Sequence, residues 1–380
     1  MKVTLPLGRI AGIKVGINWS VMVIFLLITV GLAAGRFPIL QPDLSPATYL
    51  TAGLAAGVVF FLSLLAHELS HAIVARRNGV EVEGITLWLF GGVALLRDEA
   101  PDPGAELRIS GVGPLVSLVL AVGFGVIAAA LDAAGVAAIA VEVFAWLALI
   151  NAVLAIFNLV PAAPLDGGRI LRSILWRRRG DRYGAAITAA RAGRSFGWIL
   201  VFLGLLNFVA GAGLAGLWLV MIGWFLTMAA GAEEQHAMNR RALGGLRARD
   251  IMTPRPASAP PGITVERFLD DYVFRNRHST FPLVIDGGVV GLVTLSRVKE
   301  VPRDLRATTT IDAVACPFDD VPVVGPDQPL EELLGQMSSG ADGRVLVVDH
   351  GELVGIISPA DVMRQIELGP LRDPADLARS

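Results

Sequence analysis

Long apolar runs dominate the chain up to about Ala232, and after about Arg240 charges, prolines and short Val/Ile runs replace them. Six runs approach the roughly 20 residues that a helix needs to span a bilayer. They are Asn18–Gly35, Tyr49–Ala75, Ile109–Leu131, Ala137–Val160, Ser195–Ala210 and Gly213–Ala230. Because almost no charge interrupts them, the pattern predicts six transmembrane helices rather than buried helices of a soluble core.

Basic residues gather in alternate connections between these runs. Lysine and arginine precede the first run, and arginines crowd the connections after the second and fourth runs, whereas the opposite connections contain only Arg36. Positive charge favours the cytoplasmic side of a membrane. We therefore expect a multi-pass protein of the cell membrane, with both termini and the polar C-terminal part in the cytoplasm.

Two segments near the membrane do not have a helical pattern. Gly8–Ile17 alternates from Ile13 onward, and Gly84–Leu96 combines β-branched and aromatic residues around a Gly-Gly pair expected to turn. Both are typical of strands, which must be paired or buried at this depth. The fold class expected is therefore a six-helix membrane protein with a small membrane-associated β-sheet, although both segments could instead be plain interfacial connections.

The polar part contains an internal repeat. Phe281–Val298 and Arg344–Val362 each show a strand, a turn with Asp and Gly, a second strand and the start of a helix. This pattern predicts a C-terminal α/β domain made of two similar copies. The expected boundaries are 1–232 for the membrane domain, 233–249 for a linker, 250–306 and 307–370 for the two copies, and 371–380 for a tail.

Composition narrows the possible functions. The chain has 380 residues, of which 54% are hydrophobic and 17% charged, a charge content below that of soluble or disordered proteins. A net charge of −2 supplies no basic field, so no nucleic-acid partner is expected. A single cysteine excludes a disulfide scaffold and a cysteine-rich metal site.

The second run contains the sequence His67-Glu68-Leu69-Ser70-His71. Histidines four residues apart lie on one face of a helix and can bind one metal ion, while Glu68 beside them can act as a base toward water. Three titratable groups in an apolar span are costly, so they indicate function. A polar cluster that only packs helices together is the alternative.

Two histidines leave a catalytic zinc one protein ligand short. Asp166 lies after the fourth run, where Pro161 and Pro164 prevent a regular helix and could let the chain turn back into the membrane. A helix cap is the commoner use of such an aspartate, but the paired motifs favour a ligand. Other acidic candidates follow the second run: Glu81, Glu83 and Glu99.

The HExxH pattern, together with the NxxPxxxLDGGR pattern of residues 158–169, resembles the site-2 protease family of intramembrane zinc metalloproteases. Gly113-Pro114-Leu115-Val116-Ser117 also resembles that family's middle core helix, and the resemblance covers about Met1–Ala232. It implies a three-helix catalytic core and one Zn²⁺ per chain. The implied ligands are His67, His71 and Asp166, with Glu68 as catalytic base and Asn158 on the substrate carbonyl or oxyanion.

The resemblance also implies a reaction and a substrate. The reaction is hydrolysis of peptide bonds in the transmembrane segments of membrane-anchored proteins, as in regulated intramembrane proteolysis. A helical peptide bond is hidden by its own hydrogen bonds, so a substrate must be extended first, and strand addition to the predicted sheet would hold it.

The C-terminal repeat resembles a pair of cystathionine-β-synthase (CBS) motifs, on the evidence of Gly355-Ile-Ile-Ser358-Pro-Ala-Asp361. The resemblance implies that Ser358 and Asp361 contact the phosphate and ribose of ATP or AMP, with Thr294 as the corresponding residue of the first copy. There Arg297 replaces the aspartate, so binding at the first copy is in doubt. The alternative is a purely structural pair that mediates a homodimer.

Two other functions remain open at this point. A CBS-regulated transporter would be expected to show inverted repeats and broken helices in both halves, and no such symmetry is visible. A non-catalytic membrane scaffold would not need Glu68 or a complete ligand set. Both alternatives are therefore less favoured than a nucleotide-regulated intramembrane protease.

Overall fold

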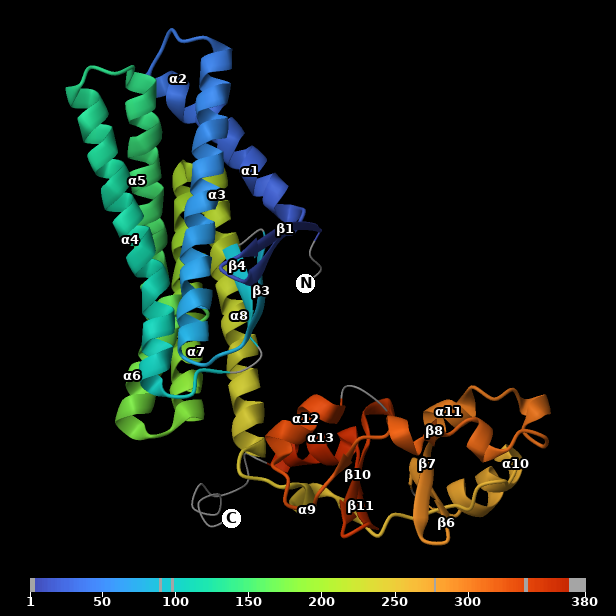
Figure 1. Cartoon of the computed structure of the whole chain (residues 1–380). Coiled ribbons are helices and arrows are strands. Elements are labelled where there is room, and N and C mark those ends of the chain that lie inside the picture. Colours follow the sequence, from blue (N-terminus) through green and yellow to red (C-terminus); the bar gives the residue numbers. More distant parts are fainter. Residues whose placement is uncertain (1–3, 89–90, 97–98, 277, 338–340, 369–380) are drawn as a thin grey trace. The chain divides into compact units, whose positions relative to one another are not determined.

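The computed structural model describes residues 4–88, 91–96, 99–276, 278–337 and 341–368 (Figure 1). The tail expected at 371–380 therefore lies outside the described residues. The chain forms two compact units, Met1–Ala237 and Met238–Ser380, and the division falls within the stretch 233–249 that was expected to be a linker. Each unit is described by itself.

The first unit is built from long helices. Its helical segments are α1 (Ser20–Val30), the π-helical η1 (Gly31–Arg36), α2 (Phe37–Leu40), α3 (Pro46–Arg77), α4 (Pro103–Ala133), α5 (Ala138–Asn158), α6 (Asp166–Arg179), α7 (Arg182–Asn207), the π-helical η2 (Phe208–Ala212) and α8 (Leu214–Leu243). Six stretches are long and apolar enough to cross a membrane: Ser20–Leu40, Pro46–Arg77, Pro103–Ala133, Ala138–Asn158, Arg182–Gly211 and Leu214–Leu243. The prediction of six transmembrane helices is confirmed.

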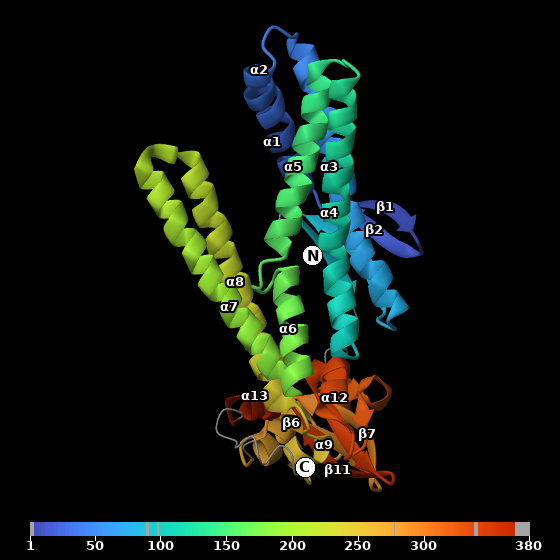
Figure 2. The same ribbon diagram turned by 90° about the vertical axis from the view of Figure 1, so that its left-hand side faces the viewer.

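The long helices begin where their sequence provides a cap. Ser45, Asp102 and Asp181 stand just before α3, α4 and α7, and each side chain accepts a hydrogen bond from a backbone N–H of the first turn. These acceptors satisfy donors that have no partner inside the helix. Figure 2 shows α7 and α8 as a hairpin that diverges from the group α3, α4 and α5.

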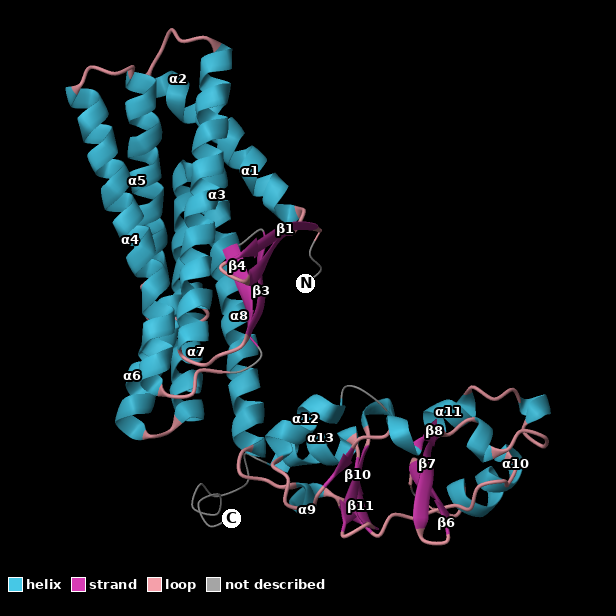
Figure 3. Cartoon of the chain, viewed as in Figure 1, coloured by secondary structure: helices cyan, strands magenta, loops and turns pink. Residues whose placement is uncertain are grey.

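A four-stranded sheet lies beside α3 (Figure 3). Its strands are β1 (Leu5–Ile10), β2 (Ile13–Ile17), β3 (Val82–Trp88) and β4 (Gly91–Leu96), in the order β1-β2-β3-β4. β2 and β3 run parallel, and β3 and β4 run antiparallel. Strands were correctly predicted in both segments, but the Gly-Gly pair opens β4 and does not form the turn before it.

The sheet is attached to α3 by apolar side chains. Ile13 of β2 and Ile85 and Leu87 of β3 are buried in one cluster with Leu64 and Ala72 of α3. Burying about 100 Å² of apolar surface stabilises a fold by roughly 2–3 kcal/mol, so these side chains fix the sheet against the helix. β4, at the edge of the sheet, is thereby held next to the middle of α3.

The second unit contains the two repeats. Its strands are β5 (Thr253–Pro254), β6 (Thr280–Ile285), β7 (Gly288–Thr294), β8 (Cys316–Pro317), β9 (Val323–Val324), β10 (Val345–Asp349) and β11 (Glu352–Ile357). Its helices include α9 (Ala248–Ile251), α10 (Val265–Phe268), α11 (Leu295–Lys299), α12 (Leu330–Met337) and α13 (Pro359–Leu368). The hairpins β6–β7 and β10–β11 correspond to the two predicted copies, so the α/β pair is confirmed.

The copies share strands. β5 precedes the first hairpin in the chain but pairs with β11, and β8 precedes the second hairpin but pairs with β7. Leu243 at the end of α8 and Leu246 just after it are buried in the core of the second copy. The C-terminal end of α8 is thus part of the packing of this unit.

Candidate metal centre

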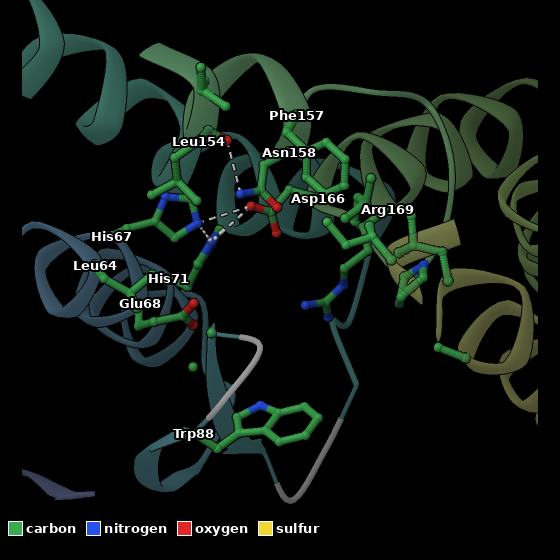
Figure 4. A pocket seen from close by; sticks show the side chains of 18 of the residues that line it. Leu64, His67, Glu68, His71, Trp88, Leu154, Phe157, Asn158, Asp166 and Arg169 are labelled. Atoms are coloured by element: carbon green, nitrogen blue, oxygen red, sulfur yellow. Dashed lines mark hydrogen bonds and ion pairs between the residues drawn. The ribbon is translucent and has the colours of Figure 1, made fainter. Parts of the chain in front are cut away.

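Two long helices and one loop bring the HExxH motif and Asp166 together. His67 and His71 lie one turn apart on α3, and both side chains are buried. Asp166 is the first residue of α6, reached after the chain leaves α5 at Asn158 and turns back through the segment 159–165. Figure 4 shows the two imidazoles and the Asp166 carboxylate pointing toward one another.

The loop before α6 depends on two glycines. A Cβ atom at Gly167 would lie 2.3 Å from the carbonyl oxygen of Val160, and one at Gly168 would lie 2.2 Å from the backbone nitrogen of Ala163. Any side chain would push the loop away from the first turn of α6. The Gly-Gly pair therefore allows the turn that delivers Asp166 to the histidines.

The three candidate ligand atoms form a nearly equilateral triangle.

 The Nε2 atom of His67, the Nε2 atom of His71 and the Oδ2 atom of Asp166 are each 3.2 Å from the other two. Ligands of a tetrahedral zinc lie about 2.0–2.1 Å from the ion and hence about 3.3 Å apart. Within the described residues, these three side chains form a group whose chemistry and spacing fit such an ion.

Space for an ion is kept free on the side of α4. A Cβ atom at Gly113 would lie 2.2 Å from Nε2 of His71 and 2.7 Å from Nε2 of His67. A side chain at this position would occupy the space that a metal needs, so Gly113 also fits a metal centre. The sequence placed Gly113 in a family-like motif but gave no indication of this contact.

The outer ring nitrogens of both histidines are also engaged. His71 Nδ1 lies 2.6 Å from the carbonyl oxygen of Ile109, and His67 Nδ1 lies 2.9 Å from Oγ of Ser117. A carbonyl oxygen can only accept a hydrogen bond, so Nδ1 of His71 donates and its Nε2 is left with a free lone pair. Such contacts are typical of metal-binding histidines.

The other predicted active-site residues lie in the same cavity of about 780 Å³. Glu68 is next to His67 on α3, and Asn158 ends α5, where its Nδ2 donates to the carbonyl oxygen of Leu154 at 3.0 Å. Apolar side chains from α3, α5 and α8 make up most of the remaining wall. Arg169, which sequence reasoning did not single out, also lines this cavity (Figure 4).

The acidic alternatives to Asp166 are not part of this group. Glu99 pairs with Arg182 at 2.5 Å, and Glu81 and Glu83 are absent from the metal-binding group found among the described residues. Asp166 does not act as the cap of α6, because the residue before that helix is Leu165 and its side chain makes no capping hydrogen bond.

The predicted nucleotide residues lie in the second unit and already have partners there. Oδ2 of Asp361 accepts hydrogen bonds from the backbone N–H and the hydroxyl group of Ser358, at 2.8 and 2.6 Å. Thr294 of the first copy donates to Oδ2 of Asp342 at 2.5 Å, and Arg297 lies 3.8 Å from the same oxygen. Asp342 was not singled out from the sequence.

Comparisons with known proteins agree with both units. The family model described as Peptidase family M50 matches residues 55–137 and 124–203, and the model described as CBS domain matches residues 248–304 and 313–368. These matches cover the helices that carry the metal centre and both copies of the repeat.

Similar proteins extend over nearly the whole chain. Rip3 of Mycobacterium tuberculosis, whose name describes a zinc metalloprotease, is 45% identical over 376 residues, which are 98% of this chain and 95% of Rip3. The zinc metalloprotease MJ0392 of Methanocaldococcus jannaschii is 30% identical over 373 residues, 98% of this chain and 99% of that protein. The solved site-2 protease from Methanocaldococcus jannaschii has 29% identity and a TM-score of 0.41, covering 60% of this chain and 94% of that one. The chain therefore belongs to peptidase family M50, the site-2 protease family, and carries a C-terminal pair of CBS domains.

Proposed function

We propose that the protein is a zinc-dependent intramembrane endopeptidase that cleaves the transmembrane segments of membrane-anchored proteins. The observation that carries this proposal is the triangle in which Asp166 meets His67 and His71, two histidines on a helix long and apolar enough to span a membrane. In this proposal the three side chains bind one Zn²⁺, Glu68 is the base, and Asn158 binds the substrate carbonyl.

Each of these residues has a defined part in peptide hydrolysis. When bound, zinc supplies a Lewis acid that polarises the peptide carbonyl and makes water a nucleophile near neutral pH. Glu68 accepts the proton from the attacking water and later gives it to the leaving amine. Asn158 uses one N–H on Leu154, which leaves its second N–H to donate to the developing oxyanion.

The cavity supports an extended, apolar substrate. Its wall includes Phe60, Phe157 and Trp218, as expected for a pocket that receives transmembrane side chains. β4 lies at the edge of its sheet and borders the cavity through Gly91 and Gly92. An unwound substrate segment added to this edge would run past the metal centre.

Cleavage of a model single-span protein by the purified chain in detergent tests the proposal. The wild-type chain should contain about one zinc per chain and cleave the model span. Glu68→Gln keeps all three ligands but cannot accept a proton, so it should keep zinc and lose cleavage. If Glu68→Gln cleaves at a near-normal rate, the proposed mechanism is wrong.

We further propose that adenine nucleotide binds at Ser358 and Asp361 of the second CBS copy and regulates the protease. The Asp361 carboxylate has four lone-pair sites. Two hydrogen bonds from Ser358 and one from Thr253, at 3.3 Å, leave one site for a ribose hydroxyl. In the first copy, Asp342 already engages Thr294 and Arg297. Because the Asp342 carboxylate already contacts these side chains of the first copy, the second copy is favoured as the nucleotide site.

The membrane topology completes the proposal. Both termini and the CBS pair lie in the cytoplasm, as the arginine-rich connections indicate. In this proposal the CBS pair also provides a homodimer contact between two chains.

A further inference from the structure

Gly92, in β4, lies against the side chain of Glu68. A Cβ atom at Gly92 would be 2.2 Å from Cγ and 2.5 Å from Cδ of Glu68, and 3.0 Å from its Oε1 atom. No residue other than glycine can therefore stand here unless Glu68 moves.

The backbone of Gly92 is held in place by the sheet. Gly92 pairs with Leu87 of β3, and Leu87 is 2% exposed in the cluster that joins the sheet to α3. β3 is in turn paired with β2 along four residues. Gly92 is thus placed against α3 by a fixed backbone, whereas the Glu68 side chain has three rotatable bonds of its own.

A flexible carboxylate loses catalytic efficiency when it samples several rotamers. Figure 4 shows the Glu68 side chain leaving α3 on the side where Trp88 of β3 lies, away from the Asp166 carboxylate. The missing side chain of Gly92 leaves the volume that this orientation needs.

We infer that Gly92 is a positioning residue for Glu68, because its lack of a side chain on a fixed backbone makes room for one orientation of the carboxylate. This inference rests on the proposed function of Glu68 as the base. The sheet then has a second role beside accepting a substrate strand, because it also sets the direction of the catalytic carboxylate.

The test uses the full chain with Gly92→Ala. The added methyl group displaces Glu68, so kcat on a model single-span substrate should fall about 100-fold, the order expected when a catalytic group is misplaced by about 1 Å. KM and zinc content should stay within about twofold of wild type, because no ligand is touched. The matched control is Gly111→Ala on α4, where an added Cβ meets nothing within 4 Å and activity should be unchanged.

A second measurement does not depend on turnover. Glu68→Ala removes the atoms that the new methyl group would meet. In the wild-type background, Gly92→Ala should therefore lower the melting temperature by about 3 °C or more. In a chain that already carries Glu68→Ala, the same change should lower it by less than about 1 °C. Equal losses in both backgrounds, or an unchanged kcat, would overturn the inference. A wild-type chain that cleaves nothing would contradict the proposed function. A smaller loss of melting temperature in the Glu68→Ala background would still support the contact between Gly92 and Glu68.

Discussion

The Nδ1 atom of His67 on α3 lies 2.9 Å from the hydroxyl oxygen of Ser117 on α4. Ser117 is fully buried, and α4 also supplies the carbonyl oxygen of Ile109 to Nδ1 of His71. One neighbouring helix therefore orients both imidazoles and leaves both Nε2 atoms facing Asp166. α4 supplies none of the three proposed zinc ligands, but its contacts determine how the two histidines point.

Ser117→Ala should weaken zinc binding by about 10- to 100-fold, the usual effect of removing a partner of a metal-binding histidine. Competition with a chelator on the purified chain would measure it. The matched control is Ser110→Ala on the same helix, because the buried Ser110 hydroxyl has no hydrogen-bond partner among the described residues. Equal zinc affinities for Ser117→Ala and wild type would contradict the orienting role of Ser117.

Gly113→Ala should abolish zinc binding without unfolding the chain. The added methyl group would lie within 2.7 Å of the Nε2 atoms of both His67 and His71, in the space between them and α4. Metal analysis of the purified variant would check this. Gly111→Ala, two residues away on α4 with open space around it, should keep a full zinc content. A Gly113→Ala chain that retains zinc would show that the ion lies elsewhere.

Glu106 and Arg172 form a buried ion pair between α4 and α6. Arg172 Nε donates to Oε1 of Glu106 at 2.5 Å, and the side chains are only 1% and 13% exposed. Burial acts to lower the pKa of Arg172, but the Glu106 carboxylate, together with Glu99 and Glu233, outweighs burial, so the pKa is raised and the guanidinium stays charged. Because α6 begins with Asp166, this pair helps to fix the third proposed ligand relative to α4.

Removing one member of that pair should be costly. Glu106→Ala leaves a buried guanidinium without its partner, and a loss of about 3–5 kcal/mol in unfolding free energy is expected. Thermal unfolding of Glu106→Ala, Arg172→Met and the double variant would show a double-variant loss well below the sum of the two single losses. Arg36→Ala is the control, since Arg36 and Glu142 are more exposed, lie 3.6 Å apart and should contribute about 0–1 kcal/mol.

The spans and the histidine pair could be predicted because their signals are local. Apolar length alone determines whether a helix can cross a bilayer, and a spacing of four residues places His67 and His71 on one face of any helix. The turn back to Asp166 was foreseeable from Pro161 and Pro164, which exclude a regular helix. These features need no knowledge of how the helices pack.

The supporting contacts could not be predicted, because they join residues far apart in the chain. Gly92 and Gly113 lie against side chains that are distant in the sequence. The sequence around a glycine in a strand or an apolar helix does not indicate which side chain it will contact. Asp342 and Thr294 are likewise 48 residues apart in the sequence, and they meet only because the two CBS copies pair. The exchange of β5 and β8 between sheets was hidden for the same reason.

Reporter fusions would test the proposed topology. Fusions after Ala232 and at the C-terminal Ser380 should report the cytoplasm, and one after Ala134, in the connection between α4 and α5, should report the opposite side. The expectation follows from the arginine-rich connections on one side only. A signal from the opposite side at Ser380 would contradict both the six-helix topology and cytoplasmic regulation by the CBS pair.

Asp361→Ala should weaken binding of ATP or AMP to the full chain by about 10- to 100-fold. Losing a charged hydrogen-bonding partner costs about 1.5–3 kcal/mol, which corresponds to that factor in affinity. The start of α13, next to Ser358, also favours phosphate, because the N-terminal end of a helix carries the positive end of its dipole. Calorimetry with the purified chain would measure both the wild-type and the variant affinity.

Arg297→Ala is the matched control for Asp361→Ala at the corresponding position of the first copy. Arg297 cannot accept a hydrogen bond from ribose, and its guanidinium already faces Asp342 at 3.8 Å, so its loss should leave nucleotide affinity unchanged. Equal losses from both variants would mean that Arg297 contacts phosphate and that the first copy also binds nucleotide. No heat from the wild-type chain at millimolar nucleotide would contradict nucleotide regulation and leave the CBS pair as a dimerisation or docking module.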